Sequence, residues 1–412
     1  MWQYGKLPKG WSTEKIGEYA SVITDYVANG SFAALAENVN YKSEPDYAVL
    51  IRLTDYNNNF NSDFVYIDEH AYEFLSKSKL YGNEIIISNV GANVGTVFKC
   101  PKLQKKMSLA PNAIMLKTKG NDDFYYYWFT SRMGQHSLQS IVTGSAQPKF
   151  NKTNFKELLV PVPPLDVQEK IAEYLCNIDK KIELNKKINK NLELQAQELF
   201  KAWFVTFETF GRKMPSSWSV AKLGDIATIK TNSFSPAKNP TVMLEHYSIP
   251  AFDEQKYPVF ELASNVKSNK YILTDNSVMI SKLNPGTKRV WRPMCISEFA
   301  VSSTEFIIFE ANDPTYKDYV FSVIDSPAFS DWMCAHTTGS TNSRQRTTPS
   351  TTLKFQIALP TQEIVSDFCK IVTPMYDMIA QNTCENRKLA AFRDSLLPKL
   401  MSGELDVSNI EI

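Results

Sequence analysis

Two long stretches of the chain carry apolar side chains at alternating spacings of four and three residues. The first series runs from Ile171 to Trp203, and every position recurs 197 residues later in a second series from Phe368 to Leu400. A repeat of this period is typical of a helix that buries one narrow stripe against a partner helix. The spacing therefore predicts two long helices, over residues 166–205 and 363–403.

The surroundings of these two series agree with helices. Asp166 follows the proline-rich segment 160–164, and an aspartate at that place is a natural N-cap. A helix of about 40 residues is roughly 60 Å long at about 1.5 Å per residue. That length exceeds the diameter of a globular domain of about 150 residues, so each helix is expected to project beyond one domain.

Each apolar series is interrupted by two asparagines at corresponding places. Asn185 and Asn189 in the first series match Asn382 and Asn386 in the second. An asparagine in an apolar seam costs stability and selects register and partner, because its amide must find another polar group. The two seams could therefore face each other, while the alternative is that each helix packs only on its own globular part.

The segments between the helices mix short strand patterns with short helix patterns. Apolar runs predict strands at 47–53, 84–88, 113–116, 278–281 and 306–309, and helical spacing is present at 124–133 and 316–324. The glycines of segment 91–95 predict a turn between strands. We therefore expect an α+β protein in which two mixed globular domains alternate with two long helices. The expected boundaries are 1–158, 159–206, 207–358 and 359–412.

The two halves of the chain also resemble each other outside the helices. Residues 7–24 match 214–231 at an offset of 207, with a shared Pro-x-x-Trp-Ser opening. Residues 97–99 match 290–292, and a Thr-Gly-Ser motif occurs at 143 and again at 338. Three blocks in the same order indicate a pseudo-twofold internal repeat. The falling offset places about 14 extra residues, an inserted loop, between positions 24 and 83.

The overall composition limits the possible functions. The 412 residues include 45 Lys and Arg against 44 Asp and Glu, a formal net charge of +1. A protein that coats nucleic acid without selectivity is usually strongly basic, so a nucleic-acid role here requires local patches. The six cysteines form no C-x-x-C pair, which favours a reducing cytoplasm. No apolar run reaches the roughly 18 residues of a membrane span.

Motifs for enzymatic chemistry are missing from the sequence. The four histidines are isolated, no phosphate-binding glycine loop with its lysine is present, and no metal-ligand spacing is found. The Asn-Pro-Pro-aromatic tetrapeptide of methyltransferases that act on amino groups of bases is also absent. A fused nuclease or methyltransferase would need such a motif, and no catalytic residue or cofactor site is assigned.

Basic and amide side chains instead gather in windows that lack acidic residues. Such windows are 99–119, 282–292 and 337–355, and the last contains the second Thr-Gly-Ser motif. Arg, Gln and Asn can bond base edges in pairs, and Lys neutralises phosphates. The candidate DNA-binding residues are Asn89, Asn93, Lys99, Ser145, Gln147, Lys149, Lys152, Lys282, Lys288, Arg289, Ser340, Asn342, Arg344, Gln345 and Arg346.

Taken together, these motifs resemble the specificity subunit of type I restriction–modification systems over essentially the whole chain. The resemblance rests on the openings at 8–18 and 215–225, the loop at 143–150, the Pro-Pro-Leu-Asp-Val-Gln-Glu segment ending at 169, and segment 396–404. The second half departs from the pattern, since its loop lacks Gln-Pro-Lys and a single Pro360 precedes its helix. Assignments of single residues there are correspondingly weaker.

The resemblance implies a non-catalytic subunit on which two methyltransferase subunits and the restriction–motor subunits assemble. It implies two target-recognition domains, each reading one half of a split, asymmetric site in double-stranded DNA. The two long helices would pair as an antiparallel coiled coil that sets the spacer, with Asn185 and Asn189 near Asn382 and Asn386. S-adenosylmethionine, ATP and Mg²⁺ would belong to the partner subunits. The alternatives are a scaffold whose repeated domains bind protein, or the fused enzyme considered above.

Overall fold

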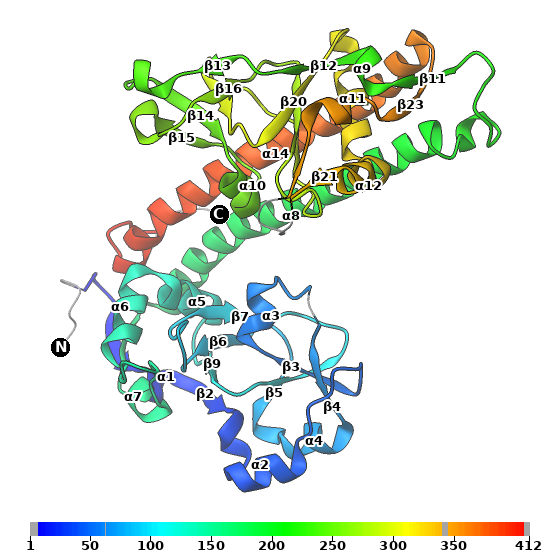
Figure 1. The fold of residues 1–412 in the computed structure, drawn as a ribbon. Coiled ribbons are helices and arrows are strands. Elements are labelled where there is room, and N and C mark those ends of the chain that lie inside the picture. The colour runs from blue at the N-terminus through cyan, green and yellow to red at the C-terminus, as the bar shows by residue number, and fades with distance from the viewer. Residues whose placement is uncertain (1–6, 62, 340–344, 408–412) are drawn as a thin grey trace. The chain divides into compact units, whose positions relative to one another are not determined.

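The computed structural model describes residues 7–61, 63–339 and 345–407 and divides the chain into two compact units. The first unit comprises Met1–Ile182 and Lys388–Ile412, and the second comprises Glu183–Arg387. The long helices α8 (Leu165–Phe204) and α14 (Gln362–Ser402) each contribute one end to each unit (Figure 1). The units therefore differ from the four segments expected from sequence, whose separate roles remain a prediction.

The first unit is built on two four-stranded sheets. One has the order β2 (Ala20–Asp25), β9 (Ala113–Thr118), β6 (Ile85–Ser88) and β7 (Val97–Lys99), and all its neighbours are antiparallel. The other has the order β4 (Val65–Ile67), β3 (Ala48–Ile51), β8 (Lys106–Leu109) and β5 (Lys79–Leu80), with β3 and β8 parallel. A separate ribbon pairs β1 (Ser12–Lys15) with β10 (Leu159–Val162).

Alternation along β6 explains why the first sheet is covered on both faces. Ile85 and Ile87 join a core with helix α5 (Asp122–Thr130) and the start of α8, whereas Ile86 joins the core facing the second sheet. Because successive side chains of a strand point to opposite faces, a fully apolar strand is expected only where both faces are buried. The remaining helices of this unit are α1 (Ile16–Tyr19), α2 (Phe32–Asn38), α3 (Leu53–Asn57), α4 (Glu69–Phe74), α6 (Arg132–Ser140) and α7 (Lys152–Lys156).

The second unit repeats this topology. Its first sheet has the order β12 (Ala227–Lys230), β20 (Phe306–Ala311), β17 (Ser277–Ser281) and β18 (Val290–Trp291). Its second sheet has the order β13 (Ser233–Phe234), β16 (Lys270–Ile272), β19 (Ala300–Ser302), β14 (Met243–Tyr247) and β15 (Val259–Leu262), again with one parallel pair, β14 and β19. Two-stranded ribbons pair β11 (Ser219–Lys222) with β23 (Gln356–Leu359) and β21 (Thr337–Thr338) with β22 (Arg346–Thr347). Its short helices are α9 (Leu223–Ile226), α10 (Ile249–Gln255), α11 (Lys317–Asp325), α12 (Pro327–Ala335) and α13 (Pro349–Thr352). The internal repeat predicted from sequence is thus a repeat of sheet order.

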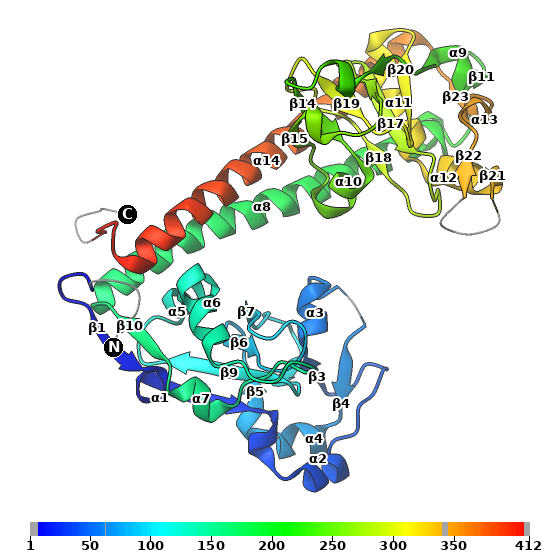
Figure 2. The same cartoon turned by 60° about the vertical axis from the view of Figure 1, so that its left-hand side comes forward.

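The long helices α8 and α14 lie side by side and antiparallel (Figure 1, Figure 2). Within the second unit, Asn185 Nδ2 donates to Asn386 Oδ1 at 2.9 Å, and Asn382 Nδ2 donates to Asn189 Oδ1 at 2.8 Å. Further along the pair, the rings of Phe200 and Phe368 are 6.2 Å apart. Rising numbers on α8 meet falling numbers on α14, which confirms the predicted antiparallel pairing.

The predicted elements agree with the structure apart from details at their ends. All five predicted strands are present, and segment 91–95 is a turn between β6 and β7. The helix expected over 124–133 is two helices, because Ser131 leaves helical geometry and its Oγ accepts from Gly134 N at 3.2 Å. Asp166 is not the N-cap of α8: the helix begins at Leu165, and the carbonyl of Pro164 accepts from Val167 and Gln168.

Candidate nucleic-acid interface

In the first unit, backbone hydrogen bonds join three segments that are distant in sequence. Asn89 N donates to Asn112 O at 3.1 Å, Phe150 N donates to Asn89 O at 3.0 Å, and Gly91 N donates to Pro148 O at 2.9 Å. These bonds connect the end of β6, the residue before β9 and the loop that follows α6. We call residues 89–91, 112 and 148–150 the first loop junction.

The second unit contains an equivalent arrangement. Lys282 N donates to Glu305 O at 2.9 Å, Thr347 N donates to Lys282 O at 3.0 Å, and Asn284 N donates to Gln345 O at 3.0 Å. We call residues 282–284, 305 and 345–347 the second loop junction. Both junctions also contain one isolated β-bridge, Val90 with Lys149 in the first and Leu283 with Arg346 in the second.

Equivalent positions of the two junctions carry different side chains. Asn89 corresponds to Lys282, Asn112 to Glu305, and Lys149 to Arg346, since each pair makes the same backbone bonds. The first junction carries two amide side chains and a lysine, and the second carries a lysine, a carboxylate and a guanidinium at the same positions. One backbone arrangement thus presents two different patterns of donors and acceptors.

The first junction and the loops that lead into it expose several polar side chains to solvent. Ser145, Gln147 and Lys149 are exposed on the loop after α6, and Asn93 is exposed on the neighbouring turn. Gly144 permits this loop with a φ of +86°, a conformation in which a Cβ would approach Gln147 O to 2.9 Å. These four candidate residues of the sequence prediction therefore lie on two neighbouring loops in the structure.

Asn89 has a different role from these exposed residues. Its Nδ2 donates to the carbonyl of Phe150 at 3.1 Å, and its Oδ1 is buried and has no hydrogen-bond partner among the described residues. The side chain therefore helps to hold the two loops of the junction together.

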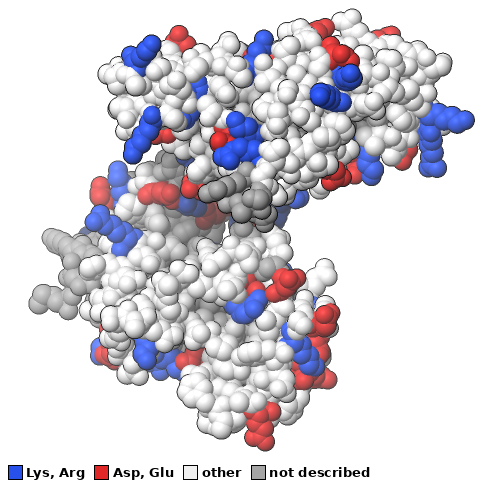
Figure 3. Space-filling model, viewed as in Figure 1, with Lys and Arg blue, Asp and Glu red and all other residues white. Residues whose placement is uncertain are grey.

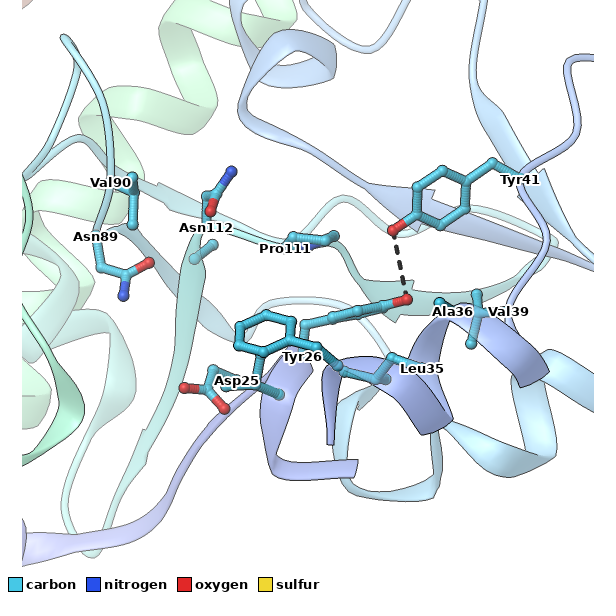
Figure 4. A pocket seen from close by; sticks show the side chains of 13 residues that line it. Asp25, Tyr26, Leu35, Ala36, Val39, Tyr41, Asn89, Val90, Pro111 and Asn112 are labelled. Carbon is cyan, nitrogen blue, oxygen red and sulfur yellow. Dashed lines mark hydrogen bonds between the residues drawn. The ribbon is translucent and has the colours of Figure 1, made fainter. Parts of the chain in front are cut away.

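A cavity of about 510 Å³ lies beside the first junction, with Asn89 and Asn112 in its wall (Figure 4). The rest of the wall is largely aromatic and aliphatic and includes Tyr26, Phe32 and Tyr41. The hydroxyl of Tyr41 donates to that of Tyr26 at 3.3 Å, and burial raises the pKa of Tyr26 above its usual range. The cavity combines ring faces with amide groups, which suits a flat, partly polar ligand surface.

In the second junction and its surroundings, the candidate basic residues are paired with acids. Arg346 bonds Glu305, Arg289 bonds both carboxylate oxygens of Asp253, and Lys288 bonds Asp325 at 2.7 Å. On the face shown in Figure 3, basic and acidic side chains lie next to each other at several places. Lys282 is half-buried, and so is Gln345. Ser340, Asn342 and Arg344 lie outside the described residues.

The candidate residue Lys99 is in contact with α5 and α8. Its ammonium group lies 2.8 Å from Asp123 and 4.6 Å from the centre of the Tyr126 ring, facing α5 and α8. Its partner Asp123 also accepts from Cys176 Sγ at 3.4 Å. The basic window in the sequence did not reveal that the side chain turns toward the helices, and a role of Lys99 in DNA binding stays a prediction.

The second unit repeats the arrangement around Lys99. Arg292 Nε bonds Asp318 Oδ1 at 2.7 Å, and Thr373 Oγ1 donates to Asp318 Oδ2 at 2.6 Å. We call Lys99, Asp123 and Cys176, and likewise Arg292, Asp318 and Thr373, the two helix anchors, because each ties a sheet to a long helix through one carboxylate.

Lys152 is also engaged within the protein. It bonds Asp25 Oδ1 at 2.8 Å, and the same oxygen accepts from Ala28 N at 2.9 Å. Lys152 therefore fastens α7 to the end of β2 beside the cavity.

Sequence reasoning missed Asn112 and Glu305. Asn112 directly precedes β9 and Glu305 directly precedes β20. The two residues are 193 positions apart, the same offset that relates 97–99 to 290–292. This shared offset could have identified Asn112 and Glu305 as equivalent positions from the sequence. Among the described residues, no cluster of three or more histidine, cysteine or acidic side chains could hold a metal ion. None of the described helices is both long and apolar enough for a membrane span.

Comparison with known proteins gives consistent findings. Residues 8–194 match the family model of the type I restriction modification DNA specificity domain. The chain is 25% identical to the type I restriction enzyme MjaIX specificity subunit of Methanocaldococcus jannaschii, over 98% of this chain and 96% of that protein. It is 22% identical to the HindI specificity subunit of Haemophilus influenzae, over 63% of this chain and 71% of that one.

The fold also has a counterpart among solved structures. The S subunit of a type I restriction-modification system from M. genitalium aligns with a TM-score of 0.63 and 16% identity, covering 96% of this chain and 97% of that one. At this identity the likeness concerns the fold alone, and it extends over both halves of the chain.

Proposed function

We propose that the chain is a specificity subunit of a type I restriction–modification system and that it selects the DNA site for its complex. It is a non-catalytic subunit, so methylation and cleavage are carried out by partner chains. We place it in the cytoplasm, assembled with two methyltransferase subunits and with restriction–motor subunits. S-adenosylmethionine, ATP and Mg²⁺ are then bound by those partners.

The observation that carries the proposal is the repeated loop junction with exchanged side chains. Two equal backbone frames would meet DNA in equivalent ways, and their different side chains would select different base pairs. Exposed Gln147 suits an adenine edge, Arg346 suits guanine, and exposed Lys149 suits a phosphate. The first unit would thus read one half of a split site, and the second unit the other half.

The near-neutral charge supports selective rather than general binding. Around the second junction, Lys288 and Arg289 are already paired with carboxylates, which reduces their attraction for any phosphate backbone. The paired long helices would fix the distance between the two half-sites. Their exposed faces, with Leu184, Ile188 and Leu194 on α8, would dock the methyltransferase subunits.

The proposal is tested by titrating the assembled complex with a DNA duplex that carries its methylation site and with a scrambled duplex, at two salt concentrations. Cognate binding should be tighter by a factor of 1,000 or more, roughly the lower limit for specific DNA-binding proteins. Lys149→Ala should weaken binding to both duplexes and lower the salt slope by about one. Lys9→Ala, which removes the same charge from an exposed position before β1, is the matched control. Equal affinity for the two duplexes would contradict the proposal.

A further inference from the structure

In the second loop junction, a carboxylate holds one edge of an arginine, and no hydrogen bond from another described residue occupies the other edge. Arg346 Nε lies 3.0 Å from Glu305 Oε2, and Arg346 Nη2 lies 3.4 Å from Glu305 Oε1. A guanidinium has five N–H donors in one plane, so this contact occupies one edge of the fork. The hydrogen bond to Glu305 also raises the pKa of Arg346, which stays charged.

The backbones of both residues are held by neighbouring strands. Arg346 pairs with Thr338 in the ribbon β21–β22, and Thr338 Oγ1 donates to the Arg346 carbonyl at 3.2 Å. The adjacent Thr347 is buried, and its Oγ1 donates to Met333 O at 3.0 Å. The Glu305 carbonyl accepts from Lys282 N at 2.9 Å. The pair therefore starts from a fixed backbone, while 44% of the Arg346 side chain remains exposed.

From this geometry we propose that Glu305 is a positioning residue that aims Arg346 at a guanine in the half-site read by the second unit. The inference rests on the proposed function. It adds the base that Arg346 reads, guanine, and the residue that orients Arg346, Glu305. The free edge of the guanidinium matches the O6 and N7 acceptors of guanine in the major groove. Glu305 restricts the rotation of the long arginine side chain, so less freedom is lost when the base is bound.

The charge of Glu305 separates this role from phosphate binding. A carboxylate next to a phosphate-binding arginine repels the DNA backbone and lowers affinity for every sequence. A carboxylate next to a base-reading arginine gives the same general loss but improves selection of one base. Removing Glu305 should therefore move general affinity and selectivity in opposite directions.

Among the described residues near the second junction, the other arginine, Arg289, does not offer the same edge. Arg289 is only 12% exposed, bonds both oxygens of Asp253, and has a buried Nη1. In the first junction the residue equivalent to Glu305 is Asn112, which carries no charge to orient Lys149. The guanine contact is thus specific to the second unit.

The experiment measures binding of the assembled full-length complex to its cognate duplex and to duplexes changed one base pair at a time in each half-site. The variants are Glu305→Gln, Arg346→Ala, the double variant, and the control Asp253→Asn, which removes the charge partner of Arg289. Thermal melting of each variant checks that the fold is retained.

Arg346→Ala should reduce discrimination at one guanine by about 5-fold to about 150-fold. Glu305→Gln should reduce discrimination at that same base pair, leave affinity for mismatched DNA equal or higher, and add nothing to Arg346→Ala. Asp253→Asn should leave discrimination unchanged.

Three results would overturn the inference. These are uniform weakening of all duplexes by Glu305→Gln, unaltered discrimination, or loss at a base pair that Arg346→Ala does not affect. If the unaltered complex shows no sequence preference, the proposed function itself fails, and this inference fails with it.

Discussion

The two helix anchors allow a quantitative prediction, because one carboxylate is buried and its counterpart is not. The Asp318 side chain is 4% exposed and that of Arg292 is 14% exposed, whereas Asp123 is 43% exposed. Asp318→Ala removes both guanidinium bonds and the acceptor of Thr373, leaving Arg292 with the partly exposed Asp377 at 3.0 Å. Removing one partner of a buried ion pair costs about 3–5 kcal/mol. Because Asp377 still pairs with Arg292 in this variant, we expect a loss of about 3 kcal/mol, at the lower end of that range. Asp123→Ala breaks a partly exposed pair and should cost about 1 kcal/mol or less.

The assay is urea unfolding of the full-length chain with each substitution, followed by circular dichroism and by tryptophan fluorescence. A loss of about 3 kcal/mol is a large share of the roughly 5–15 kcal/mol that stabilises a domain, so the Asp318 variant should unfold at clearly lower urea. The Asp123 variant serves as the matched control, since it removes the same group at the equivalent place. Equal losses for the two variants would refute the argument that burial of the carboxylate determines its contribution.

Three further predictions concern the loop, a buried histidine and the helix pair. Gly144→Ala should impair recognition of the half-site of the first unit, because a Cβ at this position would lie 2.9 Å from a backbone oxygen. Gly91→Ala is the control, since Gly91 has a similar φ of +100° but a Cβ there would meet no atom within 4 Å, and it should impair recognition less. Binding to single-mismatch duplexes measures both effects. Burial lowers the pKa of His246, whose Nδ1 bonds Glu261 at 2.9 Å, so its stabilising contribution is full above the unfolded value of about 6.5 and declines as pH falls toward the folded value. His246→Gln should therefore flatten the fall in melting temperature below about pH 6.5, as measured by thermal melting at a series of pH values. Four residues inserted at matching points of α8 and α14 add about 6 Å and should lengthen the DNA spacer by one or two base pairs of about 3.4 Å; an unchanged spacer in an active complex would count against the helices as its determinant.

The long helices were predictable because their signal is local and sustained. The apolar series and its paired asparagines located both helices to within one residue at each end, and the asparagines do meet across α8 and α14. Asn185 is 1% exposed, so its amide has to find a partner within the protein. The strands at the sheet centres were equally clear, since each is an apolar run short enough for a buried strand.

The loop junctions were predictable only in part, because long-range backbone bonds create them. Asn89 and Phe150 are 61 residues apart in sequence and are joined by a hydrogen bond that no local pattern encodes. The Thr-Gly-Ser motifs identified one loop of each junction, but Asn112 and Glu305 were not recognised. The contacts of Lys99 with α5 and α8 were not foreseen, because a basic window does not show which way a strand side chain points. Its recurrence as Arg292, together with Asp123 and Asp318, would have indicated an internal ion pair.

The central claim is that two equivalent units read two halves of one DNA site. The most direct measurement is sequencing of methylated sites in cells that carry the complete system, first with this chain and then with residues 25–157 exchanged for those of a relative. The account predicts a motif of two short parts separated by a spacer of fixed length, of which only one part changes after the exchange. A continuous motif, or a change of both parts together, would contradict it.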